Sequence, residues 1–396
     1  MAKSKILHIG VFGCRRGKTY IKALKIGKLT GARVTALCDM DESRMEACAE
    51  HCAKGRLAPK RFTDAEEFFN SGLFEAVVLC NYFSEHAKYA ALALQKGIHV
   101  LSETMAAHTM ADAAMLCDAA EASSAVYMMA ENYPYTKSNF EIKKLYKNGK
   151  GKLGKVLYAE GEYIHNMSPE DNDAISVPNE KGEYHWRKYL PVTYYSSHSL
   201  APLIFMTGEE PARVIGMSAK DDPKHAEEYR RLRPDAVGVM LVQTRSGAMF
   251  RINGSSYMGI KGNWYRLGCV NGGAETVRGE QAKVRVGYNS WLLPKDEPNP
   301  VIYEPAWESN GEEADACGHR GGDYWVMKYF IEACQGKRKP FPDVYTACTM
   351  SAVAILGWRS ILNGNVPYDV PNFRHKKERK ALYEDTASPF PPDKTI

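Results

Sequence analysis

Three glycines surround the end of a short apolar segment near the N-terminus, in the sequence HIGVFGCRRGKTY. Gly10, Gly13 and Gly17 stand where a strand would turn into a helix, an arrangement that brings phosphate groups against backbone N–H groups and a helix N-terminus. The spacing departs from the usual dinucleotide-binding fingerprint, because Arg15 occupies the place of its second glycine. A strand-to-helix turn without a ligand is therefore the alternative interpretation of these glycines.

An aspartate closes the next apolar segment along the chain. Asp39 follows Leu37 and Cys38, where an acidic side chain accepts hydrogen bonds from both ribose hydroxyls of an adenosine and repels a 2′-phosphate. This position favours NAD over NADP. Arg15 and Arg16 would instead suit a phosphate, and a loop carboxylate without a ligand is the structural alternative for Asp39.

A sheet must position these residues, and the pattern of residues 5–130 predicts one. Apolar strands alternate there with helical segments of about 10–15 residues, which predicts right-handed crossovers and a parallel, doubly wound α/β sheet. Asp64 with Glu67 predicts a capped helix after a short strand at Phe62. The other predicted elements are the strands Ile6–Phe12, Ala32–Cys38, Ala76–Cys80, His99–Ser102 and Val126–Ala130 and the helices Thr19–Leu29, Glu42–Cys52, Glu85–Lys96 and Met110–Ala122.

The pattern changes after about residue 150, where strands follow one another without helices between them. We expect an α+β domain with an antiparallel sheet of four to six strands, followed by two helices and a surface strap or oligomer contact from Pro367 onward. The chain is thus divided into a Rossmann domain (1–130) and a substrate-binding and oligomerisation domain (131–396). The predicted strands are Gly154–Tyr163, Val237–Gln243, Ala248–Ile252, Tyr265–Val270 and Ala282–Tyr288, and the helices Asp323–Cys334 and Tyr345–Leu362.

Composition excludes several classes of protein. The 396 residues are 44% hydrophobic and 25% charged with a net charge of +5, which is ordinary for a globular protein and indicates neither disorder nor nucleic-acid binding. No stretch approaches the roughly 18 apolar residues that a membrane span needs, and the N-terminal apolar run is too short for a signal peptide. The ten cysteines are dispersed, which predicts reduced thiols, a cytoplasmic location and no metal site.

Several segments match a known family in order along the chain. They are LCNYFSEHA (79–87), GIHVLSETMAA (97–107), KLGKVLYAEGEY (152–163) and SILNGNVPYDVPNF (360–373). The first two occupy the places of the TPxxxH and GxHVxxEKP segments of the Gfo/Idh/MocA proteins, which the chain resembles nearly end to end. The resemblance implies a Rossmann domain, an open-sheet α/β domain, a tightly held nicotinamide cofactor and sugar or polyol substrates.

The chain departs from this family at one catalytic position. Family dehydrogenases carry Glu-Lys-Pro, whose lysine helps to move the proton of the hydroxyl being oxidised, whereas this chain has Glu103-Thr104-Met105. Threonine has no useful acid–base pKa, so a plain dehydrogenase would lack its usual proton carrier. Four segments instead resemble the NAD-dependent α-N-acetylgalactosaminidase branch, which also lacks the lysine: YMMAENYPY (127–135), EGEYIHNM (160–167), HWR (185–187) and TYYSSHSLAPLIFMTG (193–208).

This second resemblance implies that Glu131, Tyr163, His165 and His198 line a sugar pocket near the nicotinamide. Three of them also fit a structural role: Tyr163 as a strand aromatic, His165 as a surface loop residue and His198 as a satisfied histidine at a helix start. Glu131 follows an apolar strand at the carboxyl edge of the sheet, where ligands bind in doubly wound folds. The expected cofactor contacts are Phe12, Gly13, Arg15, Arg16, Gly17, Asp39, Asn81, His86, Glu103, Asn132, Trp186 and Arg187.

Two departures from that branch concern the sugar. Its substrate-contacting tyrosine has no clear counterpart near VNGGAETVRGEQ (270–281), and the stretch GHRGGDYW (318–325) resembles its Gly-His-Gly-Gly sequence with Arg320 inserted. His319 and Asp323 suggest a polar or metal pocket, but two ligands without a third are a weak metal signal. We therefore interpret Asp323 as a helix N-cap.

The chemistry expected of NAD with these side chains is redox-assisted elimination. Hydride removal from C3 of a sugar gives a ketone, which acidifies the C2 hydrogen; the aglycone then leaves C1, water adds, and the hydride returns. His198 would act as base or proton shuttle for the C3 hydroxyl, and Tyr163 would transfer the C2 or leaving-group proton. Glu131 and His165 would orient the reacting groups. The rivals are a sugar dehydrogenase or ketosugar reductase, and a non-catalytic NAD-binding regulator. We also expect a homo-oligomer, because the open sheet leaves an apolar outer face.

Overall fold

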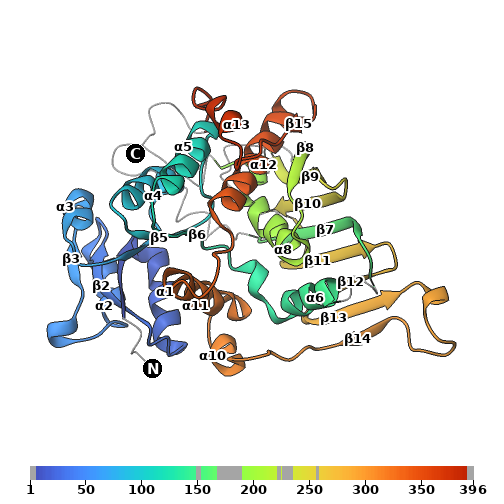
Figure 1. Ribbon diagram of the computed structural model, residues 1–396, viewed down its shortest axis with the longest axis horizontal. Helices are drawn as coiled ribbons and strands as arrows, with labels where there is room; N and C mark the ends of the chain where they lie inside the picture. The colour runs from blue at the N-terminus through green and yellow to red at the C-terminus, as the bar shows by residue number, and fades with distance from the viewer. Residues whose placement is uncertain are drawn as a thin grey trace.

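The computed structural model describes residues 6–148, 153–166, 190–220, 224, 235–255 and 258–389. Two sheets lie toward opposite ends of the molecule, with helices between them (Figure 1). In the described ranges, none of the helices combines the length and apolar character needed to cross a membrane.

The first sheet has six parallel strands in the order β3-β2-β1-β4-β5-β6. This is the strand order of a dinucleotide-binding fold, in which ligands bind at the carboxyl edge of the strands. The predicted doubly wound α/β class is confirmed. Its strands are β1 (Leu7–Phe12), β2 (Ala32–Cys38), β3 (Lys60–Phe62), β4 (Ala76–Leu79), β5 (His99–Ser102) and β6 (Tyr127–Met129).

Five helices connect these strands. Asp64 accepts a hydrogen bond from the Glu67 backbone N–H at 2.8 Å, so the predicted cap of α3 is confirmed. The first helix differs from its prediction, because it starts directly after Gly13 rather than at Thr19. The helices are α1 (Cys14–Ile26), α2 (Glu42–Ala49), α3 (Ala65–Asn70), α4 (His86–Gln95) and α5 (Met110–Glu121).

The second sheet has nine strands in the order β14-β13-β12-β11-β7-β10-β9-β8-β15 and is antiparallel except at the β7–β10 pair. The estimate of four to six strands was therefore too low. One missed strand, β12, contains Gly272 and Gly273, which weaken a strand pattern; a Cβ at Gly272 would lie 2.3 Å from the carbonyl oxygen of Gly287. The strands are β7 (Val156–Ile164), β8 (Pro211–Lys220), β9 (Asp235–Thr244), β10 (Met249–Ser255), β11 (Gly262–Cys269), β12 (Gly272–Val277), β13 (Glu280–Tyr288), β14 (Val301–Tyr303) and β15 (Tyr368–Asp369).

Helices α6 (Lys137–Asn148), α8 (Ser197–Thr207) and α12 (Val344–Leu362) cover one face of this sheet. The helix α8 approaches β7 so closely that a Cβ at Gly161 would lie 2.1 Å from the carbonyl oxygen of Ser199. This close approach brings the start of α8 beside the end of β7, where two predicted site residues lie.

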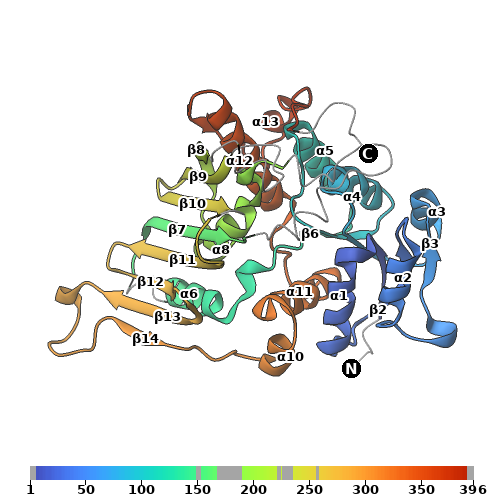
Figure 2. The same ribbon diagram turned by 180° about the vertical axis from the view of Figure 1, so that it is seen from behind.

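The C-terminal part of the chain returns to the first sheet. Helix α11 (Gly322–Cys334) lies beside α1, as Figure 2 shows from behind. After the short α10 (Gly311–Asp315) and the long α12, the tail adds β15 to the second sheet and continues into α13 (Lys376–Lys380). The fully buried Arg379 of α13 bonds Asp118 on α5 at 3.0 Å. The tail is thus a strap that joins the second sheet to helix α5 of the first domain.

Candidate functional site

Two positions in the turn from β1 into α1 leave room only for glycine. Gly13 has a positive φ of 93° and a Cβ there would lie 2.3 Å from the carbonyl oxygen of Cys80; a Cβ at Gly17 would lie 2.4 Å from Val11. These glycines bring the N-terminus of α1 against β1 and β4. The backbone N–H groups of Arg15 and Arg16 have no hydrogen-bond acceptor among the described residues. Free donors at the positive end of a helix fit a pyrophosphate.

Asp39 follows β2 at the same edge of the sheet, with its side chain 8% exposed. One carboxylate oxygen accepts the backbone N–H of Cys14 at 2.7 Å and the other accepts that of Asp41 at 3.0 Å. The Arg44 guanidinium lies 3.6 Å away. The carboxylate therefore caps the first turn of α1, and its contact with a ribose stays a prediction.

Three further predicted cofactor residues lie at this edge, namely Phe12, Asn81 and His86. The Phe12 ring packs against Phe69 and Tyr89, at ring-centroid distances of 5.6 and 4.7 Å, and its contact with a cofactor stays a prediction. The side-chain oxygen of Asn81, just after β4, is buried without a hydrogen-bond partner in the described part of the chain. An orphaned acceptor there suits a hydroxyl or amide donor of a bound dinucleotide.

His86 has both ring nitrogens beside backbone carbonyl oxygens, that of Met105 at 3.0 Å and that of Asn81 at 3.2 Å. The ring is 2% exposed, and burial lowers its pKa below the ordinary value. The geometry makes His86 a brace between the loops that follow β4 and β5. Its predicted contact with the cofactor is not tested by these bonds.

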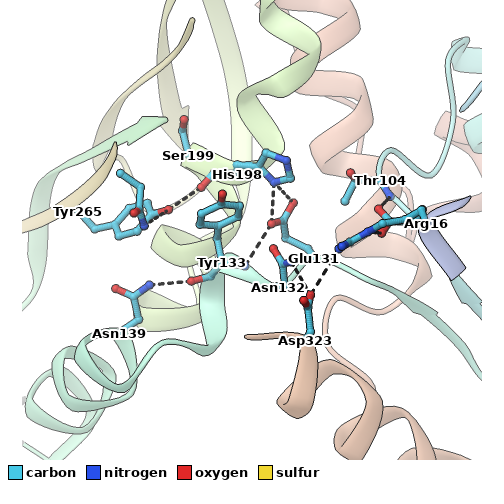
Figure 3. Close-up of polar contacts among 12 residues, drawn as sticks. Arg16, Thr104, Glu131, Asn132, Tyr133, Asn139, His198, Ser199, Tyr265 and Asp323 are labelled. Atoms are coloured by element: carbon cyan, nitrogen blue, oxygen red, sulfur yellow. Dashed lines mark hydrogen bonds and ion pairs between the residues drawn. The ribbon is translucent and has the colours of Figure 1, made fainter. Parts of the chain in front are cut away.

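Arg16 links two carboxylates from distant parts of the chain. Its Nε donates to Glu103 at 2.5 Å and its Nη2 lies 3.4 Å from Asp323 (Figure 3). Glu103, directly after β5, also accepts the Tyr20 hydroxyl at 2.6 Å and the Thr104 backbone N–H at 3.1 Å. Burial disfavours the Glu103 carboxylate, but the Arg16 charge and these hydrogen bonds outweigh it and lower its pKa. Glu103 is therefore held as an anion.

Asp323 is a buried anchor rather than a helix cap. The N-cap of α11 is Gly321, and Asp323 lies inside the first turn, so the N-cap prediction was wrong. Its carboxylate accepts Asn132 Nδ2 at 2.9 Å and His319 Nδ1 at 2.8 Å. Burial raises the pKa of Asp323, but the hydrogen bond from His319 and the charge of Arg16 reverse that effect and lower it.

Glu131 and His198 form the centre of the site. Glu131, just after β6, is fully buried, and both its oxygens lie 2.8–2.9 Å from Nδ1 of His198, the second residue of α8. The Tyr265 hydroxyl donates to the His198 carbonyl oxygen at 2.8 Å and fixes that turn of α8 (Figure 3). With Nδ1 bound to a carboxylate, Nε2 is left to accept a proton. The structure thus brings together two residues that the resemblance places in one pocket.

Aromatic rings surround this pair. Tyr133 and Tyr163 have ring centroids 4.8 and 4.6 Å from that of His198, and Tyr195 lies 6.1 Å away. His165, at the end of β7, stacks on Tyr163 at 6.0 Å. Burial is the main cause that raises the pKa of Tyr163, and its hydrogen bond with Tyr133 adds to the effect. Tyr163 is therefore a phenol that keeps its proton.

Three of the tyrosines at this site were not predicted from the sequence. Two predicted cofactor residues cannot be placed. Tyr133 and Tyr195 lie within the quoted motifs, so their nearness to Glu131 and His198 was an available signal, whereas Tyr265 lies in an ordinary strand. Trp186 and Arg187 lie outside the described residues. Within the described ranges, no group of three or more His, Cys, Asp and Glu side chains is placed to hold a metal ion.

Family comparisons agree with this geometry. A family model described as the oxidoreductase family, NAD-binding Rossmann fold (Gfo/Idh/MocA) matches residues 7–131. The N-terminal region is a Gfo/Idh/MocA Rossmann domain. A second model, the glycosyl hydrolase 109 C-terminal domain, matches residues 299–380. The resemblance stated from the sequence is confirmed, and the chain is an NAD-dependent carbohydrate enzyme.

Relatives of this chain carry glycosidase names at low identity. It is 26% identical to a glycosyl hydrolase family 109 protein of Phocaeicola vulgatus, over 93% of this chain and 94% of that one. It is 21% identical to an α-N-acetylgalactosaminidase of Shewanella oneidensis, over 94% and 86% of the two chains.

Solved structures share the whole fold. A levoglucosan dehydrogenase in complex with NADH and L-sorbose matches with a TM-score of 0.77 at 16% identity, over 93% of this chain and all of that one. The WlbA dehydrogenase of Bordetella pertussis, in complex with NADH and UDP-GlcNAcA, matches with a TM-score of 0.71 at 19% identity, over 94% and 99%. At such identities these structures establish the fold alone.

Proposed function

We propose that this enzyme cleaves a glycosidic bond by transient oxidation of the sugar at C3. The observation that carries the proposal is the Glu131–His198 pair, which gives the site a proton acceptor where the usual lysine is replaced by Thr104. NAD, when bound, would take the C3 hydride and return it after cleavage, so no cofactor is consumed. The glycosidase names of the relatives support cleavage over net oxidation.

His198 would remove the proton of the C3 hydroxyl through Nε2. The positive charge that then develops on the ring is balanced by the buried Glu131 carboxylate at Nδ1, 2.8 Å away. Side-chain exposure is only 14% for His198 and 0% for Glu131. A dry contact of this kind strengthens the electrostatic stabilisation of that charge.

Tyr163 and His165 would serve the next proton. Because its pKa is raised, Tyr163 keeps its phenolic proton. It can therefore donate a hydrogen bond but does not act as a base. We assign it to the C3 oxygen, where a donor stabilises the enolate that forms when C2 loses its hydrogen. His165, stacked on Tyr163 at 6.0 Å, is then the base for the C2 hydrogen. The sequence alone led us to expect Tyr163 to move the C2 or leaving-group proton and His165 to orient the sugar.

The cofactor site would hold the dinucleotide along the carboxyl edge of the first sheet. The free N–H groups of Arg15 and Arg16 would take the pyrophosphate, Asp39 the adenosine ribose, and the orphaned Asn81 oxygen a donor nearer the nicotinamide. Arg16, held between Glu103 and Asp323, would position this end of the site rather than bind phosphate through its side chain.

The test is proton NMR of the protein with NAD and a panel of simple glycosides in D2O, beginning with methyl and 4-nitrophenyl α-N-acetylgalactosaminides. We expect release of the aglycone, deuterium at C2 of the freed sugar and no net NADH. Net NADH with an intact glycosidic bond would make the protein a dehydrogenase. Binding of NAD without turnover of any sugar in the panel would favour a regulator.

A further inference from the structure

The turn before α11 carries an arginine at a position whose backbone suits glycine. Arg320 has φ 54° and ψ 43°, in the left-handed region. A residue with a Cβ disfavours this conformation, which glycine adopts without steric cost. Such a conformation persists where the surrounding contacts determine it, and it is found often at ligand sites. The contacts of the Arg320 side chain therefore indicate why an arginine occupies this position.

Two neutral amide groups hold the Arg320 guanidinium. Its Nη1 donates to Asn263 Oδ1 at 3.1 Å and its Nη2 donates to Gln281 Oε1 at 2.9 Å. A guanidinium has five N–H donors, so three of them have no acceptor among the described residues. The amides thus fix the guanidinium without neutralising its charge.

Other arginines in this part of the second sheet are paired with glutamates. Arg285 on β13 lies 3.0 Å from Glu275, and Arg278, just after β12, contacts Glu162. Within the described ranges, no carboxylate forms an ion pair with Arg320, and its residue is exposed. Its positive charge is therefore available to a ligand that arrives from solvent.

Asn263 places this guanidinium beside the residues proposed to bind the sugar. Asn263 lies directly opposite Tyr163 where β11 pairs with β7, so the two side chains share one face of the sheet. Its Nδ2 donates to the Tyr265 hydroxyl at 3.2 Å, which in turn donates to the His198 carbonyl oxygen (Figure 3). Burial raises the pKa of Tyr133, and the charge of the guanidinium opposes that rise. The guanidinium thus lies at the rim of the pocket.

We propose that Arg320 binds a carboxylate on the sugar ring, so that the substrate is a glycoside of a hexuronic acid. This rests on the proposed function, in which C2 and C3 of the ring lie at Tyr163 and His198. C5, which carries the carboxylate of a hexuronic acid, lies across the ring from C2. The carboxylate can then extend toward the rim, where a guanidinium pairs with its planar oxygens through parallel N–H donors.

The first test measures binding separately from turnover. Protein loaded with NAD is titrated calorimetrically with D-galacturonate, D-glucuronate and the matching neutral hexoses. We expect at least one hexuronate to bind about 10–100-fold more tightly than its hexose, because a charge-assisted contact is gained. The kcat/KM values for 4-nitrophenyl uronides and hexosides, tested as both anomers, should show the same preference. Equal affinities, or tighter binding of galactose 6-sulfate than of galacturonate, would overturn the proposal.

The variant Arg320→Gly separates binding from a structural role. Glycine suits the backbone at this position, so the variant should keep the denaturation midpoint of the wild type. Hexuronate affinity should fall by about 10–100-fold, while affinity for the hexoses and for NAD stays unchanged. Arg320→Lys should recover only part of the hexuronate affinity, since it keeps the charge but loses the planar fork. Equal losses on hexuronates and hexoses would show that Arg320 only braces Asn263, and would overturn the proposal.

A matched control removes the same charge from the same sheet. Arg285→Gln lies on the strand that carries Gln281 and should leave the preference for hexuronates unchanged. The two proposals also fail differently. Aglycone release from neutral glycosides without any preference for uronides would overturn carboxylate binding and keep the proposed cleavage. Hexuronate binding that depends on Arg320, with net NADH and an intact glycosidic bond, would overturn the cleavage and keep the carboxylate site.

Discussion

At the scale of single residues, the site is built on two carboxylates that have no access to solvent. Glu131 and Asp323 are both fully buried, and each accepts a hydrogen bond from Nδ1 of a histidine. A buried carboxylate is costly unless it is paired and hydrogen-bonded. Removal of either member of such a pair therefore acts twice, because it also strands its partner. Each carboxylate and its histidine are therefore coupled in any kinetic measurement.

The Glu131–His198 pair should behave as a unit. Glu131→Gln and His198→Asn should each lower kcat by about 10²–10⁴-fold, because each removes the charge-balanced proton acceptor. The double variant should be little worse than either single variant. Steady-state kinetics on the cleaved glycoside measure this, with NAD affinity as the test of folding. Glu378→Gln, at an exposed histidine contact, is the control. Additive losses would show that the two residues act independently.

At the scale of elements, the sequence predicted the strands of the first sheet better than the helix at the site. Helix α1 begins at Cys14, five residues before its predicted start, because the residues before Thr19 carry no Ser, Thr, Asp or Asn cap of their own. The cap is Asp39, which follows another strand. A cap supplied from a distant strand leaves no local pattern, so only the fold can show it.

The contact between α8 and β7 sets the position of His198. Gly161→Ala would place a Cβ 2.1 Å from the Ser199 carbonyl oxygen, which is backbone and cannot turn aside. We expect a loss of about 1–3 kcal/mol in the free energy of unfolding, measured by denaturant titration. Activity should fall further, because α8 must move relative to Glu131. Gly268→Ala, where the nearest atom is 3.4 Å away, is the matched control. Equal effects of the two changes would contradict this account.

The brace formed by His86 between two loops should appear in the pH dependence of stability. Burial lowers its pKa below the ordinary value of 6.5, so the folded state stays unprotonated at a pH where the unfolded chain binds a proton. Stability should therefore fall as the pH drops below about 6.5, by at most about 1.4 kcal/mol per pH unit. His86→Gln should be less stable overall but lose less between pH 7 and pH 5. The measurement is denaturant unfolding across this range, with the exposed His375→Gln as control. Parallel curves for wild type and His86→Gln would refute the assignment.

At the scale of the whole molecule, the site depends on contacts between segments that are far apart in the sequence. Arg16 and Asp323 are 307 residues apart, yet they meet where α11 packs beside α1 (Figure 2). The motifs singled out Glu131 and His198, since each lies in a recognisable segment, and the structure brings their side chains into contact. Periodicity and spacing carry no information about which distant segments touch, so the Asp323 anchor was interpreted as a local cap. Such long-range pairs are the part of the site that only the assembled fold reveals.

The C-terminal strap should be a major contributor to the stability of this assembly. Arg379 is fully buried and binds two carboxylates on α5, Asp118 at 3.0 Å and Glu121 at 2.5 Å. The side chains of these two acids are 26% and 33% exposed. Arg379→Met strands both carboxylates, and we expect a loss of about 2–4 kcal/mol and faster proteolysis of the tail. Arg213→Met is the control, since Arg213 and its partner Asp369 on the same strap are exposed and their 2.8 Å contact should contribute less than about 1 kcal/mol. If the two variants unfold at the same denaturant concentration, the strap is only a surface attachment. A larger loss for Arg379→Met, with NAD affinity retained, would show that the strap stabilises the fold without forming part of the cofactor site.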